Sequence, residues 1–152
     1  MLHSLRRDRS SLRRVPRGRL AALRVLPGSL AMVIAVRLGL SLSTLALLRR
    51  KLLPERSFDS HDLVQVGRIA WAVRTTSWVV PFASCLTQAQ ACQALLARDG
   101  IASTLCLGVK PGKSARMLAH AWLICDDRLV TGGEGADVAA FRLLTELGPV
   151  AA

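Results

Sequence analysis

The chain has 152 residues, which is enough for one domain with a buried core. It is 51% hydrophobic, only 4% aromatic and without tyrosine. Its net charge of +11 comes entirely from residues 1–56, which hold thirteen lysines and arginines against two acids, whereas residues 57–152 hold eight of each. A basic segment without interleaved aromatic residues argues against a nucleic-acid partner. The charge alone still leaves a non-enzymatic protein that binds peptides, nucleic acid or membranes as an alternative.

The four cysteines show neither a CxxC pair nor the spacing of zinc ligands, so the sequence predicts no metal site. We expect no cofactor. Cys92, Cys106 and Cys125 lie in apolar stretches and are expected to be small buried hydrophobic residues. The chain is larger than most disulfide-stabilised modules, so reduced thiols and a cytoplasmic location are the expectation.

The first elements are a basic arm and an apolar segment. Residues 1–24 carry eight arginines and are expected to be disordered or loosely helical. Residues 30–48 are nearly all apolar apart from Arg37, and the basic run 49–51 follows. We expect a helix that packs on the rest of the protein, or lies in an anionic membrane surface with its arginines toward lipid phosphates. A membrane-spanning helix has the right length, but Arg37 near its centre would cost roughly 2.5–3.5 kcal/mol, and a cleaved signal peptide fits poorly.

Two helices and a sheet are expected after this extension. Residues 59–77 show helical periodicity, with Asp59 or Ser60 as the cap. Pro81 stops continuation, and Ser84 is a natural N-cap for a helix over 85–98. Gly100 has the position of a helix C′ residue. Residues 1–56 are therefore interpreted as an extension and 57–152 as the principal domain.

Strands are predicted over 101–109, 117–125 and 128–131, with a two-residue hairpin turn at 126–127. Residues 137–147 are predicted to form a short amphipathic helix. Helices followed by antiparallel strands indicate an α+β fold. In the strand over 117–125 the side chains of Leu118, His120, Trp122 and Ile124 share one face, which we expect to face the preceding helix.

The strongest chemical signal is a cysteine and a histidine in suitable settings. Cys85 begins the predicted helix 85–98, where unpaired amides and the helix dipole favour a thiolate. His120 is fixed on a neighbouring strand and can act as its base. A cysteine and a histidine far apart in sequence are typical of a cysteine hydrolase or acyltransferase. Trp122, on the same face as His120, is expected to be a core residue or a wall of the substrate cleft.

A catalytic histidine is usually oriented by a third group. Asp126 and Asp127 lie at the turn, roughly 20 Å along the strand from His120. Glu134 is the only carboxylate in the segment expected opposite the histidine, and a glycine-rich bulge would be needed to aim it correctly. A backbone carbonyl, Thr131 or a more distant acid are the alternatives.

Five short segments surround these residues: Cys85–Ala89, Arg98–Ala102, Leu107–Val109, Ala119–Trp122 and Val130–Gly133. Together they resemble the lasso-peptide leader peptidases, the transglutaminase-like cysteine proteases that form the C-terminal half of the B protein in this microcin-processing family. The resemblance covers residues 60–148, and the apolar, arginine-rich segment before them resembles the family's N-terminal region.

The resemblance implies a papain-like thiol mechanism on a transglutaminase-like fold, with Cys85 as nucleophile and His120 as general base. The family's third member is an acid shortly after the histidine strand, where this sequence has Gly132, with Glu134 just beyond. The implied substrate is a ribosomally made precursor peptide, and a separate asparagine-synthetase-like enzyme would close the macrolactam ring. The first 55 residues are too basic and apolar for a compact β-rich module, so a separate leader-recognition protein is expected. Acyl transfer to an amine is the alternative reaction.

Overall fold

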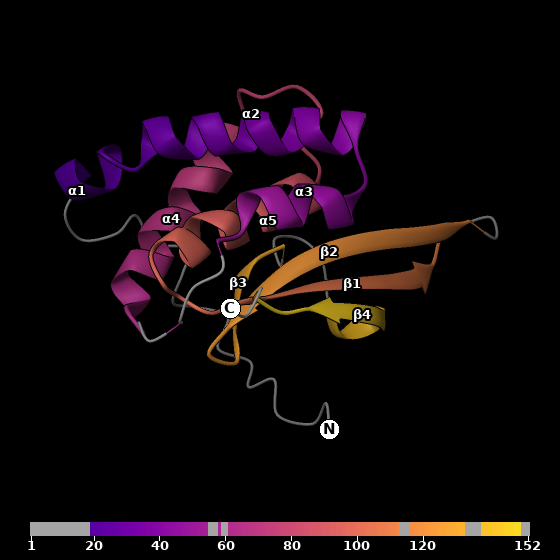
Figure 1. The fold of residues 1–152 in the computed structure, drawn as a ribbon. Helices are drawn as coiled ribbons and strands as arrows, with labels where there is room; N and C mark the ends of the chain where they lie inside the picture. Colours follow the sequence, from indigo (N-terminus) through magenta and orange to yellow (C-terminus); the bar gives the residue numbers. More distant parts are fainter. Residues whose placement is uncertain (1–18, 55–57, 59–60, 113–115, 133–137, 150–152) are drawn as a thin grey trace.

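The computed structural model describes residues 19–54, 58, 61–112, 116–132 and 138–149. Helices come first in the chain and a small antiparallel sheet follows, so the predicted α+β fold is confirmed (Figure 1). The charged arm of residues 1–18 and the position of Glu134 lie outside the described residues.

Three helices occupy the N-terminal part of the described chain. They are α1 (Arg19–Leu23), α2 (Leu26–Leu42) and α3 (Leu45–Leu52). Thr44 caps α3, because its hydroxyl accepts a hydrogen bond from the amide of Leu47 at 3.4 Å. The structure thus divides the apolar segment 30–48 between two helices.

The next two helices begin at capping residues. In α4 (Leu63–Ser77) the cap is Asp62, whose carboxylate accepts hydrogen bonds from two amides of the first turn. In α5 (Cys85–Arg98) it is Ser84, as predicted from the sequence. Gly100 has a positive φ of 72°, which suits a residue that ends a helix. The predicted bounds of α5 are confirmed, and α4 begins later than predicted.

The sheet has the strand order β3-β2-β1-β4, and every neighbouring pair is antiparallel. The hairpin between β2 and β3 is tight: both turn residues, Asp126 and Asp127, have positive φ, and Cys125 pairs with Arg128 as predicted. The strands are β1 (Thr104–Pro111), β2 (Met117–Cys125), β3 (Arg128–Thr131) and β4 (Arg142–Leu147).

The helix predicted over 137–147 is wrong. In the part of this segment that is described, a 3-10 turn, η2 (Val138–Ala140), leads into β4. Strand β4 pairs with the edge of β1 that β2 does not occupy. This pairing provides the backbone hydrogen bonds that the segment would otherwise form within a helix.

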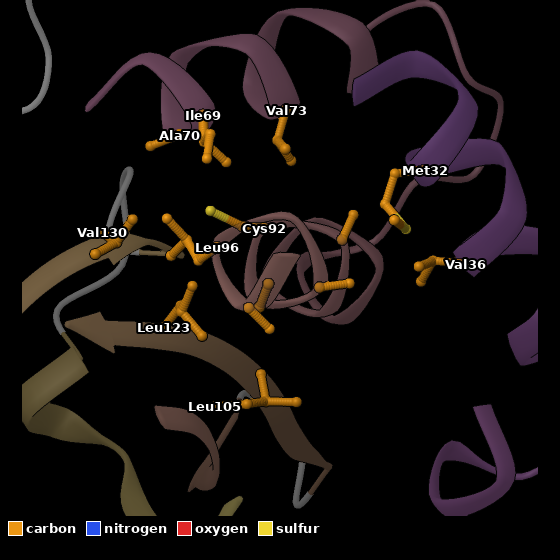
Figure 2. Close-up of a cluster of buried hydrophobic side chains, with 14 of the residues drawn as sticks. Met32, Val36, Ile69, Ala70, Val73, Cys92, Leu96, Leu105, Leu123 and Val130 are labelled. Carbon is orange, nitrogen blue, oxygen red and sulfur yellow. The ribbon is translucent and has the colours of Figure 1, made fainter. Parts of the chain in front are cut away.

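Helix α5 lies between the sheet and the outer helices α2 and α4 (Figures 1 and 2). Figure 2 shows Leu105 and Leu123 of the sheet pointing toward α5, while Val73 of α4 and Val36 of α2 approach it from other sides. Nine residues of this helix are buried. Its alanines allow neighbouring elements to approach closely on every side.

The apolar helix α2 packs on this core through one face only. Met32, Val33 and Val36 are buried against α4 and α5, whereas Ile34 and Leu38 are exposed. By length and composition alone, the segment Leu20–Leu42 could also cross a membrane, with a mean hydropathy of 1.8.

The face of strand β2 that packs against the helices is not the face predicted from the sequence. Ala121, Leu123 and Cys125 belong to the core shared with the helices. Because side chains alternate along a strand, His120 and Trp122 project from the other face. Both faces of this strand are apolar, so periodicity alone could not decide which one meets α5.

Candidate active site

Cys85 is the first residue of α5, directly after the Ser84 cap. The first amides of a helix have no carbonyl partner within it, and they favour negative charge nearby. The side chain is half-buried and packs against the edge of the apolar core. The structure therefore places this thiol as predicted, at a helix start and partly open to solvent.

The other three thiols are buried and poorly suited to act as nucleophiles. Burial raises the pKa of Cys106 and of Cys125 to about 11, with smaller contributions from the Glu146 and Asp126 carboxylates respectively. Complete burial, with a smaller contribution from Cys125, raises the pKa of Cys92 further. None of the four cysteines forms a disulfide. Cys85 is consequently the only one of the four cysteines that is not buried.

His120 lies on β2 opposite Gly108 of β1 and is partly buried. Its Nε2 atom is in hydrogen-bonding contact with the carbonyl oxygen of Gly132. A carbonyl oxygen only accepts, so Nε2 must be the donor and carry the proton. In the neutral ring this leaves Nδ1 with a free lone pair, which is the form that a general base requires.

Two aromatic rings hold the imidazole on the sheet. The ring centroids of His120 and Trp122 are 6.2 Å apart with an interplanar angle of 21°, and Phe141 lies 5.1 Å from His120. Trp122 is only 5% exposed and therefore buried, and its expected role as a wall of the substrate cleft stays a prediction. A Cβ atom built at Gly108 would lie 2.7 Å from the Trp122 ring, so a glycine is needed there.

Gly132 lies near the place where the family resemblance implies an acid. Its φ of +85° is one that residues with a side chain rarely adopt. A Cβ atom built there would lie 2.7 Å from the Cα of Trp122 and would also collide with the Ala121 carbonyl oxygen. No acid fits this backbone, and the main-chain carbonyl contacts the histidine instead. A backbone carbonyl was one of the alternatives left open by the sequence.

The structure shows no hydrogen bond between Cys85 and His120, although both residues are described. Cys85 packs against the core that Ala121, the neighbour of His120, also joins. His120 itself projects from the opposite face of β2, so the predicted contact through a shared face is wrong. Strand β3 pairs with β2 only over Leu123–Cys125, which leaves the His120 end of this edge without a partner among the described strands.

The aspartates at the hairpin turn lie away from this site. The Asp126 carboxylate is 3.2 Å from Nδ1 of His61, and both side chains are well exposed. The position of Glu134 is not described, so its predicted role as the orienting acid stays a prediction. The pairing of β2 with β3 does contain a bulge, between Leu123 and Ile124. This bulge shifts the register of the described pairing by one residue.

Two parts of the site were missed by sequence reasoning. The Gly132 carbonyl is a backbone group and has no side-chain signature, although a glycine where an acid is expected is itself a signal. Phe141 fell within a segment predicted to be helical. Its ring also lies 4.4 Å from the Lys110 ammonium nitrogen.

A family model described as the transglutaminase-like superfamily matches residues 30–146. The match begins inside α2 and therefore includes helices from both sides of the boundary predicted at residue 56. No curated protein and no solved structure gives a significant match to the chain. The family model covers most of the sequence and contains both Cys85 and His120, so the chain belongs to the transglutaminase-like superfamily, whose members are typically cysteine peptidases or acyltransferases.

Proposed function

We propose that this protein is a cysteine peptidase that removes the leader from a ribosomally synthesised lasso-peptide precursor. The observation that carries the proposal is the contrast among the thiols: Cys85 alone is partly open, and it stands at the start of a capped helix. The second support is the imidazole of His120, whose Nε2 proton is held by the Gly132 carbonyl. The specific substrate rests on the sequence resemblance to leader peptidases.

The chemistry would run in two steps. Nδ1 of His120 takes the proton of the Cys85 thiol, and the thiolate attacks the carbonyl carbon at the leader–core junction. The backbone amides at the start of α5 stabilise the oxyanion. The imidazolium then protonates the departing amine, which releases the core peptide and leaves the leader as a thioester. His120 next removes a proton from water, the resulting hydroxide attacks the thioester, and the thiol is regenerated.

This mechanism requires a closer approach of the two side chains than the structure shows. Catalytic hydrogen bonds are often long or poorly aligned before substrate binds and tighten afterwards. We therefore place the formation of the Cys85–His120 contact in the substrate complex.

Two further proteins belong to the proposal. A separate leader-recognition protein would present the precursor, and an asparagine-synthetase-like enzyme would close the ring on the released core. Because the superfamily also contains acyltransferases, an amine could replace water in the second step. The products of the reaction distinguish the two outcomes: a free leader carboxylate indicates hydrolysis, and an amide of the added amine indicates transfer.

The test is a cleavage assay with a precursor peptide and the leader-recognition protein, read by mass spectrometry. Cys85→Ala should lower the rate by at least about 10³-fold, since it removes the nucleophile. Cys106→Ala is the matched control and should retain activity. At neutral pH, iodoacetamide should label Cys85 in the folded chain well before the three buried thiols. An active Cys85→Ala variant, or equal labelling of all four thiols, would overturn the assignment.

A further inference from the structure

The side of α2 that faces away from the core is apolar. Ile34, Leu38 and Leu42 follow one another at helical spacing and are exposed, while Val33 and Val36 on the opposite side are fully buried. A surface helix in a protein that contacts only water usually carries charged residues on its outer side. The only charged residue within α2 is Arg37.

The turn between α4 and α5 extends this apolar surface. Trp78 is 87% exposed and Phe82 is 85% exposed, and Val79 between them is also exposed. A groove joins the turn to α2 and is lined by Ile34, Arg37 and Leu38 of the helix and by Val79, Val80 and Pro81 of the turn. We call α2 residues 34, 38 and 42 together with residues 78–82 the apolar face.

Arginines lie in the same part of the chain as this face, and one of them lines the groove. The Arg37 guanidinium lies in the groove, 5.9 Å from the centroid of the Phe82 ring. Arg24 precedes α2 and is exposed, as is Arg50 in the last turn of α3. The whole net charge of +11 resides in residues 1–56, the part of the chain that contains α2. An apolar face in a basic segment complements an anionic lipid surface, where acyl chains accept the apolar groups and phosphates pair with arginine.

We propose that the apolar face binds the surface of an anionic lipid bilayer, with α2 lying in the plane of the interface. Trp78 and Phe82 would enter the boundary between headgroups and acyl chains, where aromatic side chains are favoured. Interfacial binding leaves the packing of α2 on the core intact, whereas spanning the bilayer would pull Met32, Val33 and Val36 away from α4 and α5. A second copy of the chain is a poorer occupant, because it would bring two strongly positive surfaces together.

Membrane binding of this kind would also place the proposed nucleophile at the bilayer. Cys85 follows Phe82 by three residues, and an extended chain rises at most about 3.6 Å per residue, so their Cα atoms are within roughly 11 Å. The peptidase would then act on peptides at the membrane surface. The binding itself does not depend on peptidase activity, and Cys85→Ala should bind vesicles as the unmodified chain does.

The experiment is co-sedimentation of the full chain with phosphatidylcholine vesicles, with and without phosphatidylglycerol, at low and high salt. Binding should require the anionic lipid and weaken as salt rises. The double substitution Trp78→Ser with Phe82→Ser should lower the partition constant about tenfold or more. Leu144→Ser, at an exposed apolar residue of β4 on the sheet, is the matched control and should bind normally.

Tryptophan fluorescence identifies which surface makes the contact. Vesicles should shift the emission to the blue, and Trp78→Phe should abolish most of that shift while sedimentation persists. Absence of binding would overturn the proposal. So would binding that the double substitution leaves unchanged, since the basic arm alone would then suffice. Light scattering that shows self-association lost in the double variant, without vesicle binding, would equally overturn it and assign the face to a second copy of the chain.

Discussion

At the scale of single residues, the tautomer of His120 depends on a main-chain carbonyl. The Gly132 oxygen accepts a hydrogen bond from the Nε2–H group and so keeps Nδ1 available as a base. The ring is held from the sides by Trp122 and Phe141. A carbonyl has no charge and cannot stabilise the imidazolium as strongly as a carboxylate would. A nearby acid would therefore still contribute to catalysis.

Substitution of Gly132 tests the role of its carbonyl. Gly132→Ala forces a side chain into a positive-φ position where the Cβ meets the backbone of Ala121 and Trp122, so the carbonyl must move away from His120. We expect a fall in kcat of about 10-fold or more, and a changed pH profile of kcat/KM. Gly28→Ala is the control, because nothing lies within 4 Å of a Cβ atom there. Unchanged kinetics in Gly132→Ala would rule out an orienting role for this carbonyl.

Glu134 is the candidate for the additional acid. Glu134→Gln should reduce turnover much more than Asp127→Asn, because Asp127 lies in the hairpin turn, roughly 20 Å from the histidine along the strand. The loss should appear mainly in kcat, as expected for a group that stabilises the imidazolium in the transition state. If Asp127→Asn proves the more damaging change, the turn takes part in the site and the assignment to Glu134 fails.

At the scale of elements, a buried arginine ties helices to the sheet. Arg49 of α3 is only 8% exposed, and its guanidinium hydrogen-bonds to Gln93 of α5 and, at 2.6 Å, to the carbonyl of Gly148 after β4. Gln93 in turn donates to the carbonyls of Ser103 and Leu147. Burial lowers the pKa of Arg49 from its ordinary value. The basic run 49–51 is thus divided between a buried structural residue and exposed charges.

Replacement of Arg49 should destabilise the fold. Arg49→Met leaves the amide oxygen of Gln93 and the Gly148 carbonyl without their partner, at a cost of about 1.5–3 kcal/mol. Arg50→Met removes an exposed charge from the adjacent position and should cost about 0.5 kcal/mol or less. Urea denaturation followed by circular dichroism measures both. Equal effects of the two substitutions would show that the buried network contributes nothing specific.

Local signals explain which elements the sequence could predict. The α5 helix has a serine cap, a preceding proline stop and a glycine after its end, and its bounds were predicted correctly. The hairpin at Asp126–Asp127 was also predicted, because two turn-forming residues stand between apolar runs. Strand β4 was not, since a short amphipathic segment can form a helix or a strand, and its pairing with β1 decides the outcome.

In the candidate site, too, local features could be predicted from the sequence and tertiary packing could not. Cys85 was placed correctly because a helix start is a local property. The direction of His120 was predicted wrongly, because Leu118 and Trp122 on one face of β2 are as apolar as Ala121 and Leu123 on the other. Which face meets α5 depends on tertiary packing. The bulge at Leu123 and Ile124 has no signature in the sequence either.

At the scale of the whole molecule, the segment before residue 57 is part of the core. Val33 and Val36 of α2 and Leu48 of α3 belong to the same cluster as residues of α4, α5 and the sheet. Outward from this core, α2 shows the apolar face that is proposed to meet lipid. One side of α2 thus stabilises the core, and the other is proposed to bind lipid. The contribution to the core can be tested without lipid.

Removal of this segment should destroy the fold. A chain that begins at residue 57 exposes the buried surfaces of α4 and α5 that Met32, Val33 and Val36 cover, and each such apolar side chain is worth about 1.5–3 kcal/mol when buried. Because a domain's net stability is only about 5–15 kcal/mol, we expect aggregation and no cooperative thermal unfolding. A chain that begins at Arg19 keeps every residue of the described core and should unfold cooperatively. A soluble fragment of residues 57–152 that unfolds cooperatively and keeps Cys85 reactive would show that α2 and α3 are dispensable, and would leave membrane attachment as their principal role.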